Sequence, residues 1–175
     1  LVGENGTGKS TLLKIILGDI HPQKGTVNKD GNFLELPQNF APFANETVSD
    51  ILGVTAKLRA LEKVMEGVGT NKDLLTLDDD WEIKNDTQKL LEKADLGHLD
   101  FDRRISSLSG GETSKLFFTS LLTKKPDLAL MDEPTNHLDA ESREFLYGFI
   151  KEYPGKLLII SHDRQLLRLM EEIIE

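Results

Sequence analysis

The chain has 175 residues, a length that suits one domain of ordinary size. It contains no cysteine, and this excludes thiolate metal sites, redox dithiols and cysteine nucleophiles. Its 21 basic and 30 acidic residues give a formal net charge of −9, the wrong sign for a module that binds nucleic acid over its whole surface. No apolar run approaches the roughly 20 residues of a membrane-spanning helix, so we expect no membrane span.

The N-terminal part predicts a helix followed by two short strands. Apolar residues recur at helical spacing over residues 11–17. Residues 25–27 and 33–36 have the composition of strands and flank Asp30-Gly31, a dipeptide typical of hairpins. We therefore expect a small antiparallel part in the sheet.

The middle of the chain is helical and acidic, and residues 47–107 are predicted to form a helical subdomain. Beyond it, residues 127–131 and 156–160 are typical of buried parallel strands, separated by a helix over 140–150. The predicted fold class is thus α/β. Because the chain opens just before a glycine-rich loop and residues 172–175 suggest a strand cut short, we expect a fragment truncated at both ends.

Residues 3–10, GENGTGKS, match the pattern G-x-x-x-x-G-K-[ST] between apolar residues and a predicted helix. Such a loop points successive backbone N–H groups inward, and the start of the helix adds partial positive charge. Lys9 can reach the β- and γ-phosphates of a nucleotide, and the Ser10 hydroxyl can bind Mg²⁺. The alternative, a glycine-rich loop with a surface lysine, fits the strand–loop–helix context less well.

Two predicted strands end in polar residues. Asp132 and Glu133 follow one of them, and His162 follows the next. Since ligands of open α/β sheets collect at the carboxyl ends of the strands, these three side chains are expected near the same phosphates. Alone, each could be a helix cap; together with the glycine-rich loop they favour a nucleoside triphosphatase.

Residues 109–112, Ser-Gly-Gly-Glu, precede a predicted helix. They form a second helix start at which an anion can bind. Alone this is a capping sequence. In a chain that also has a phosphate loop, it suggests that two copies complete each other's sites. Asp78-Asp79-Asp80 lacks the ligand spacing of a calcium loop and is interpreted as an acidic helix start. We interpret His21, Trp81 and His98 as structural or surface residues.

Together the motifs resemble the ATP-binding cassette (ABC) family over essentially the whole chain. The phosphate loop, LPQ around Gln38, LSGGE at 108–112, LMDEP at 130–134 and SHD at 161–163 occur in that family's order. EPTNHLD at 133–139 and SHDR at 161–164 most resemble the ABC-F branch, soluble tandem-cassette ATPases that act on ribosomes. Glu112, where transporter signatures usually have glutamine, indicates the same branch.

The resemblance implies a cytoplasmic ATPase and a P-loop NTPase cassette, with a mainly parallel sheet, a small antiparallel part and a helical lobe carrying the signature motif. It also implies residue roles. ATP would contact the phosphate loop at Gly3, Asn5, Gly6, Thr7, Gly8, Lys9, Ser10 and Thr11. Mg²⁺ would be organised by Ser10, Gln38 and Asp132, with Gln38 also near the nucleotide. The catalytic residues would be Glu133, which orients or activates water, and His162, which contacts the γ-phosphate. The nucleotide of a partner would meet Ser109, Gly110, Gly111, Glu112 and Asp139.

The partners implied are a second ATP-binding cassette, in tandem or as a homodimer, and the ribosome. The ribosome would be contacted through parts absent here, because no long basic helix lies between Gln38 and Ser109. Two alternatives stay open: the ATPase subunit of a membrane transporter, and a nucleotide-gated binding module that does not hydrolyse ATP. Glu133 and His162 argue against the second.

Overall fold

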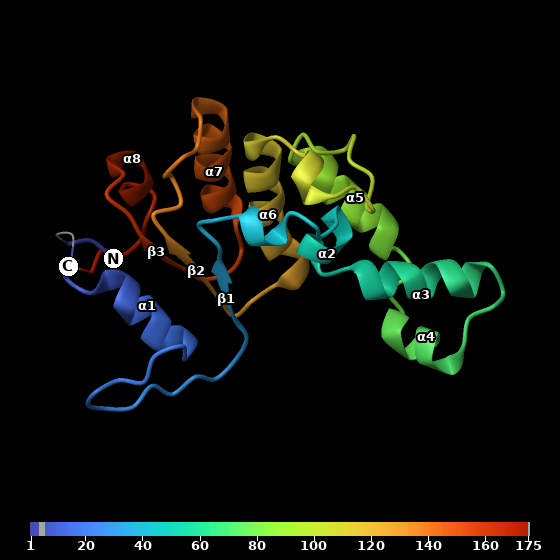
Figure 1. Cartoon of the computed structure of the whole chain (residues 1–175), viewed down its shortest axis with the longest axis horizontal. Coiled ribbons are helices and arrows are strands. Elements are labelled where there is room, and N and C mark those ends of the chain that lie inside the picture. Colours follow the sequence, from blue (N-terminus) through green and yellow to red (C-terminus); the bar gives the residue numbers. More distant parts are fainter. Residues whose placement is uncertain (4–5, 175) are drawn as a thin grey trace. The chain divides into compact units, whose positions relative to one another are not determined.

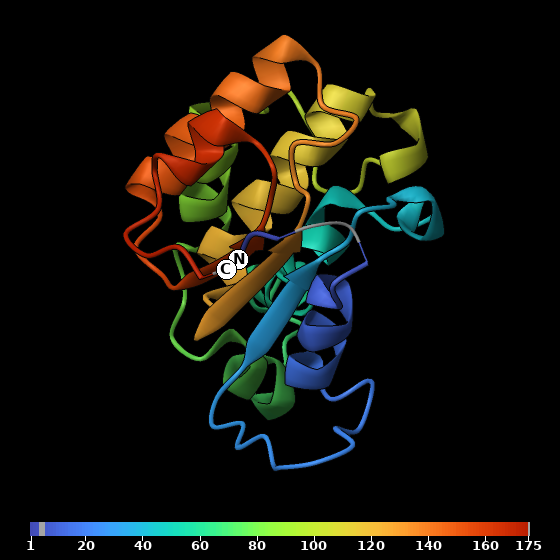
Figure 2. The ribbon, with the colours of Figure 1, turned by 90° about the vertical axis from the view of Figure 1, so that its left-hand side faces the viewer.

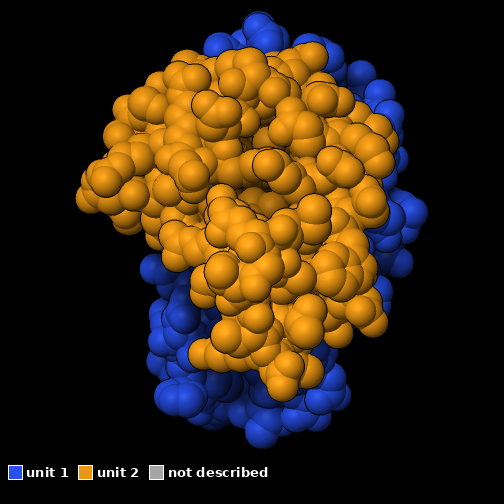
Figure 3. Space-filling view, turned by 90° about the vertical axis from the view of Figure 1, so that its right-hand side faces the viewer, with its two compact units in different colours: residues 1–39, 125–175 blue, residues 40–124 orange. Residues whose placement is uncertain are grey.

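The computed structural model describes residues 1–3 and 6–174. The described part contains a three-stranded sheet in the order β1-β2-β3 and several helices (Figure 1). The chain divides into two compact units, residues 1–39 with 125–175 and residues 40–124, which have different colours in Figure 3. The elements are α1 (Lys9–Leu17), β1 (Phe33–Leu36), α2 (Val48–Leu52), α3 (Thr55–Met65), α4 (Asn71–Leu77), α5 (Ile83–Lys93), α6 (Gly110–Lys124), β2 (Leu128–Asp132), α7 (Ala140–Glu152), β3 (Leu157–Ile160) and α8 (Arg164–Leu167), with short 3₁₀ turns at Ala41–Phe43 and Ile105–Ser107.

Strand β2 is the centre of the first unit. It pairs in parallel with β1, where Leu36 is opposite Met131, and in parallel with β3, where Asp132 is opposite Ile160. Leu130 of β2 is fully buried in a cluster with Leu13 of α1 and Ile160 of β3. Helix α1 thus covers one face of the sheet, while α7 and α8 lie on the other side (Figures 1 and 2).

The predicted helix over 11–17 and the two parallel strands are confirmed, but the predicted hairpin does not form. Residues 25–27 lie outside any strand, and Val27 is 43% exposed. The start of β1 is instead tied to β2, because the Asp127 carboxylate accepts the Asn32 N–H at 2.7 Å and the Asp127 N–H donates to the Asn32 carbonyl at 2.8 Å. An isolated two-stranded hairpin is marginal in water, so β1 pairs where a buried strand is available. Among the described residues, the antiparallel pairing found is a single bridge between Thr47 and Arg104.

The C-terminal segment also differs from its prediction as a strand. The described residues 172–174 lie outside every strand. The Val2 N–H donates to the Ile174 carbonyl at 2.9 Å, and the residues that the structure describes form no ladder here. The strand predicted for this short segment therefore does not form over its described residues.

The second unit is helical, and the starts of α2 and α4 follow from side-chain capping. Thr47 and Asp50 form a reciprocal capping box at the start of α2, and Thr70 and Asp73 form another at the start of α4. The apolar faces of these helices are buried, with the largest fully buried side chains of the unit at Ile51, Leu52, Leu77, Leu91, Leu96, Leu116 and Leu121. Helical periodicity thus accounts for the buried faces of this unit, and local capping accounts for two of its helix starts.

The segment after β3 is held by a buried tyrosine. The Tyr147 hydroxyl on α7 donates to Asp163 Oδ2 at 2.7 Å, and Tyr147 is 4% exposed. Asp163 Oδ1 accepts the N–H groups of Gln165 and Leu166 and caps α8. Desolvation raises the pKa of Asp163, but the hydrogen bonds from Tyr147 and the two backbone groups outweigh it and leave the pKa below its usual value.

Burial predicts a large difference between two leucine-to-alanine substitutions in the helical unit. Leu91 is fully buried on α5, whereas Leu75 on α4 is 80% exposed. We expect Leu91→Ala to lower the free energy of unfolding by about 2–5 kcal/mol through lost burial and a residual cavity. Leu75→Ala should change it by less than about 0.5 kcal/mol. Urea unfolding measures both; equal losses would contradict the assigned core.

Tyr147→Phe removes the donor to Asp163 while keeping the ring. We expect the free energy of unfolding at pH 7 to fall by about 1–2 kcal/mol. Because the folded-state pKa of Asp163 lies below its usual value, the stabilisation is present above that usual pKa and is lost as the pH falls through the folded-state pKa. Unfolding curves of the two proteins should therefore converge in acid. Tyr153→Phe is the matched control, and a pH-independent difference for Tyr147→Phe would contradict the role given to Asp163.

Candidate functional site

The glycine-rich loop leads directly into α1. Gly8 is the residue before the helix, with φ +94°, and Gly6 has φ +85°. Among residues 1–3 and 6–174, no side chain caps this helix start, in contrast to α2 and α4. Among the described residues, a Cβ at Gly6 or Gly8 would meet nothing within 4 Å, so the left-handed backbone favours glycine at both positions. The loop therefore presents backbone N–H groups at an uncapped helix start, which favours an anion.

A cavity of about 240 Å³ lies at this loop. Its walls come from the loop, the first turn of α1 and the carboxyl ends of β2 and β3. The lining residues are Gly6, Gly8, Lys9, Ser10, Thr11, Asp132, Glu133 and Ile160. The Lys9 ammonium donates to the Gly3 carbonyl at 2.7 Å, which places this cation at the loop.

Glu133 has a strained backbone and joins two strand ends. Its φ is +47°, in the left-handed region that is costly for a residue other than glycine. The Glu133 N–H donates to the Ile160 carbonyl at 2.8 Å. Its carboxylate accepts the backbone N–H of His162 at 3.3 Å. The same carboxylate lies 3.5 Å from Nε2 of the His162 ring. Glu133 and His162, the two predicted catalytic residues, are thus in contact beside the cavity.

Gln38 and Asp139 occupy different surroundings. The Gln38 amide donates to the Asp132 carbonyl at 2.8 Å, so Gln38 lies beside the end of β2. Asp139 caps α7, where its carboxylate accepts the Ser142 N–H at 2.8 Å. Asp139 is not among the residues that line the cavity. It lies at the start of the helix that follows the EPTNHLD segment.

The oxygen atoms that line the cavity are suitable ligands for Mg²⁺. The Ser10 hydroxyl and the Asp132 carboxylate both line it, and hard oxygen ligands of this kind suit that ion. Within residues 1–3 and 6–174, no group of three or more His, Asp or Glu side chains could hold a metal by itself. A magnesium ion that keeps several waters and shares its ligands with phosphate oxygens needs only one or two protein ligands.

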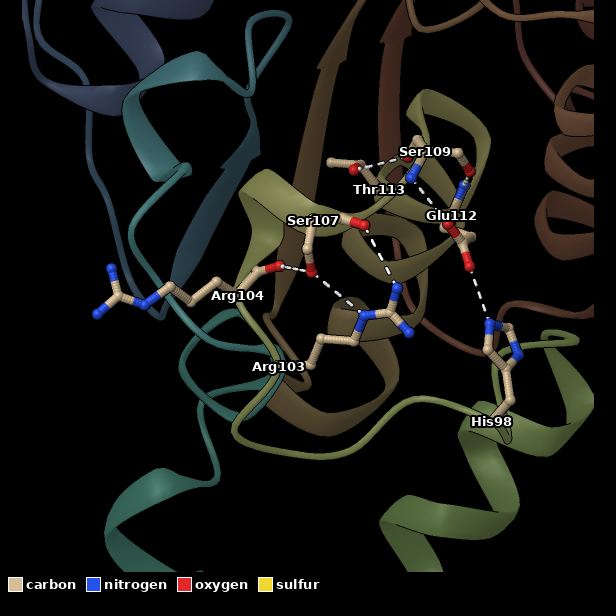
Figure 4. A network of polar contacts seen from close by, with 7 residues as sticks. All are labelled: His98, Arg103, Arg104, Ser107, Ser109, Glu112 and Thr113. Carbon is tan, nitrogen blue, oxygen red and sulfur yellow. Dashed lines mark hydrogen bonds and ion pairs between the residues drawn. The ribbon is translucent and has the colours of Figure 1, made fainter.

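The LSGGE motif lies in the helical unit and is a complete capping box. The Ser109 N–H donates to Glu112 Oε2 at 2.7 Å, and the Glu112 N–H donates to Ser109 Oγ at 3.2 Å. Gly110 and Gly111 form the first turn of α6. His98 Nε2 is hydrogen bonded to Glu112 Oε1 at 2.8 Å, and Figure 4 shows this network.

The contacts of Glu112 keep it ionised. Its pKa is lowered to about 2, first by the Ser109 backbone N–H and then by the His98 side chain. The sequence predicted the cap but not the histidine, because His98 lies 14 positions before Glu112 and no local spacing joins them. Only the folding of the segment between α5 and α6 places the two side chains together.

The predicted site residues divide between the two units. The first unit contains Gly3, Gly6, Thr7, Gly8, Lys9, Ser10, Thr11, Gln38, Asp132, Glu133, Asp139 and His162, and the second contains Ser109, Gly110, Gly111 and Glu112. Of these, the cavity brings together the phosphate loop, Asp132 and Glu133, with His162 bound to Glu133. Asn5, also predicted to contact ATP, lies outside the described residues. No helix in the described part of the chain is long and apolar enough to cross a membrane.

Comparisons with known proteins identify the family. The sequence profile described as ABC transporter matches residues 1–136. ABC transporter F family member 2 of Arabidopsis thaliana is 35% identical over an alignment that covers 100% of this chain and 23% of that protein. The energy-dependent translational throttle protein EttA of Mycobacterium tuberculosis is 33% identical, covering 95% of this chain and 33% of that protein. The chain thus spans about a third or less of the length of these curated relatives.

The fold is shared with solved ATP-binding cassettes. The ADP conformation of an ATP-binding cassette of an ABC transporter superposes with a TM-score of 0.65 at 24% identity, covering 97% of this chain and 72% of that one. This likeness and the family profile confirm the predicted P-loop NTPase cassette. The relatives from the F family agree with the resemblance found in EPTNHLD and SHDR. The chain therefore belongs to the ATP-binding cassette family, as an ATPase cassette whose relatives include members of the F branch.

Proposed function

We propose that this chain binds Mg-ATP and hydrolyses it when the cassette closes against a second cassette. The observation that carries the proposal is the cavity at the phosphate loop, which is lined by a lysine, a serine hydroxyl and two carboxylates. The positive φ angles at Gly6 and Gly8 and the uncapped start of α1 support phosphate binding at this place.

The proposed chemistry is positioning and charge stabilisation. Lys9 would neutralise the β- and γ-phosphates, while Ser10 and Asp132, with Gln38 beside them, would hold Mg²⁺. When bound, Mg²⁺ supplies charge neutralisation between the phosphate oxygens. Glu133 would orient the attacking water and accept its proton, and His162 would bind the γ-phosphate. The contact between Glu133 and His162 supports the joint action of these two residues.

The second cassette would complete the site. Ser109, Gly110 and Gly111 are proposed to close over the nucleotide of the partner, with Asp139 at the same interface. The capping box supports this role for Ser109: its Oγ accepts the Glu112 N–H, and a hydroxyl that accepts one bond still has its hydrogen to donate to a phosphate. A group supplied in trans to a phosphoryl-transfer site can be worth on the order of 10³-fold in rate.

The parent protein is proposed to be a cytoplasmic tandem-cassette protein of the F branch that acts on the ribosome, in translation or in antibiotic protection. The support comes from relatives: the name of EttA describes a translational throttle, and the Arabidopsis protein is a member of the F family. This chain covers only part of each of them. The activity and partners of the whole protein therefore belong to this proposal.

Replacing Glu133 by Gln in the full-length product of the native reading frame tests the catalytic assignment. Loss of a general base costs about 10²–10⁴-fold in rate, so we expect ATP turnover to fall by at least about 100-fold. ATP binding should be retained, and the closed ATP-bound form should accumulate. Phosphate release measures turnover, and compaction in small-angle scattering with and without ATP measures closure.

Glu152→Gln at the exposed end of α7 is the matched control and should have normal turnover. Unchanged turnover in Glu133→Gln would contradict the role of Glu133. A wild-type protein that closes on ATP without releasing phosphate would instead support the non-hydrolysing module.

The ribosome part of the proposal has a separate test. We expect the full-length Glu133→Gln protein to sediment with ribosomes in ATP and to remain in the supernatant in ADP, because closure would create the binding form. Sedimentation through a sucrose cushion measures this. Recovery with membrane vesicles, and not with ribosomes, would support the transporter subunit and contradict the proposed site of action.

A further inference from the structure

The start of α6 contains an electrostatic conflict. The proposed function brings the phosphate of a partner's ATP to Ser109, Gly110 and Gly111. Glu112 lies in the same first turn, and its pKa of about 2 means that the carboxylate is ionised at neutral pH. A carboxylate stabilises a helix start, but it repels a phosphate that approaches the same start. The direction in which this carboxylate is held therefore bears on the approach of the phosphate.

The two oxygens of Glu112 have different partners. Oε2 accepts the Ser109 N–H at 2.7 Å and so holds the loop. Oε1 is 2.8 Å from His98 Nε2, and the His98 side chain comes from the segment after α5 (Figure 4). A carboxylate bound on both oxygens cannot rotate freely, and a donor on its outer oxygen reduces the negative charge that it presents.

The rest of the loop is anchored independently of His98. Both the N–H and the hydroxyl of Thr113 donate to the Ser109 carbonyl, each at 2.9 Å. On the other side, the Arg103 guanidinium donates to the Ser107 hydroxyl at 3.2 Å and to the Ser107 carbonyl at 3.3 Å. The backbone of the loop is thus fixed at two points, and His98 acts on the orientation and charge of Glu112.

We propose that His98 is a positioning residue of the ATPase reaction, which holds the Glu112 carboxylate on Ser109 and screens it from the nucleotide of the partner cassette. The inference rests on the proposed function, because it requires that the signature loop meets a phosphate. It adds a residue outside every motif of the chain. It also explains how a carboxylate can stand at a phosphate-binding helix start.

The contact contributes little to folding. The side chains of His98 and Glu112 are 55% and 26% exposed, and ion pairs at such sites have small effects on stability. A change at His98 should therefore leave the thermal transition nearly unmoved. Its effect should appear in closure and turnover, where the partner's phosphate meets the carboxylate.

The test is a double-mutant cycle in the full-length protein, with His98→Ala, Glu112→Gln and the double variant. In the protein that keeps Glu112, we expect His98→Ala to lower ATP turnover about fivefold. This is the effect expected from the loss of one exposed charge-assisted contact. In the Glu112→Gln background, the same change should have no further effect, because no charge remains to be screened. Glutamine can still accept the Ser109 N–H with its amide oxygen.

Two measurements separate this effect on turnover from a loss of ATP binding or of folding. Binding of a fluorescent ATP analogue at the phosphate loop should be equal in wild type and His98→Ala, and so should the thermal transition. His21→Ala, an exposed histidine of the other unit, is the matched control and should keep full turnover.

The outcomes are distinct. Equal losses from His98→Ala in both Glu112 backgrounds would show a structural role and overturn the proposal, and so would normal turnover in His98→Ala. If the wild-type protein binds ATP but does not turn it over, the proposed function itself fails, and this is visible in the first measurement of the cycle. A fivefold loss that disappears with Glu112→Gln supports the inference.

Discussion

The parallel pairing of β2 on both of its edges is the constraint on which the site depends. Side chains alternate along a strand, so the register that buries Leu130 against α1 also places Asp132 on the same face. The Ile160 carbonyl, which accepts the Glu133 N–H, continues this pairing one residue beyond the strand. A slip by one residue would exchange the two faces and remove the carboxylate from the cavity. Burial of an apolar strand therefore fixes the position of the polar groups that follow it.

The helix starts of the chain divide by the way their N–H groups are satisfied. Thr47 and Thr70 close the starts of α2 and α4 with their own side chains, together with the aspartates three residues later. Helix α1 begins after Gly8, and no side chain in the described part of the chain caps it. Helix α6 is capped in a third way. Its cap is the ionised Glu112 carboxylate, which is also hydrogen bonded to His98. The starts of α3 and α5 also have no side-chain cap among the described residues, so it is the glycine-rich loop and the cavity before α1, and not the missing cap alone, that distinguish α1.

The sequence predicted those parts of the molecule that depend on local spacing. The phosphate loop, the carboxylates at the end of β2 and the capping box at Ser109 each follow from residues close together in the chain. The sequence could not predict the pairing of β1, because Asp127 competes with the local hairpin for Asn32 across the fold. His98 was missed for the same reason, since its partner is defined only by tertiary folding. The preference of Asp30-Gly31 for a hairpin turn stabilises the chain less than pairing and burial beside an apolar strand do.

Gly6 and Gly8 have open space around them within the described part of the chain, so the handedness of their backbone is itself a restriction on the phosphate loop. An L-amino acid placed there has room for its side chain, but it resists the left-handed backbone by roughly 1–2 kcal/mol per residue. The mirror-image residue prefers positive φ and would not resist it. The chirality of the amino acids thus selects glycine at these two positions, even where the surrounding protein would accept something larger.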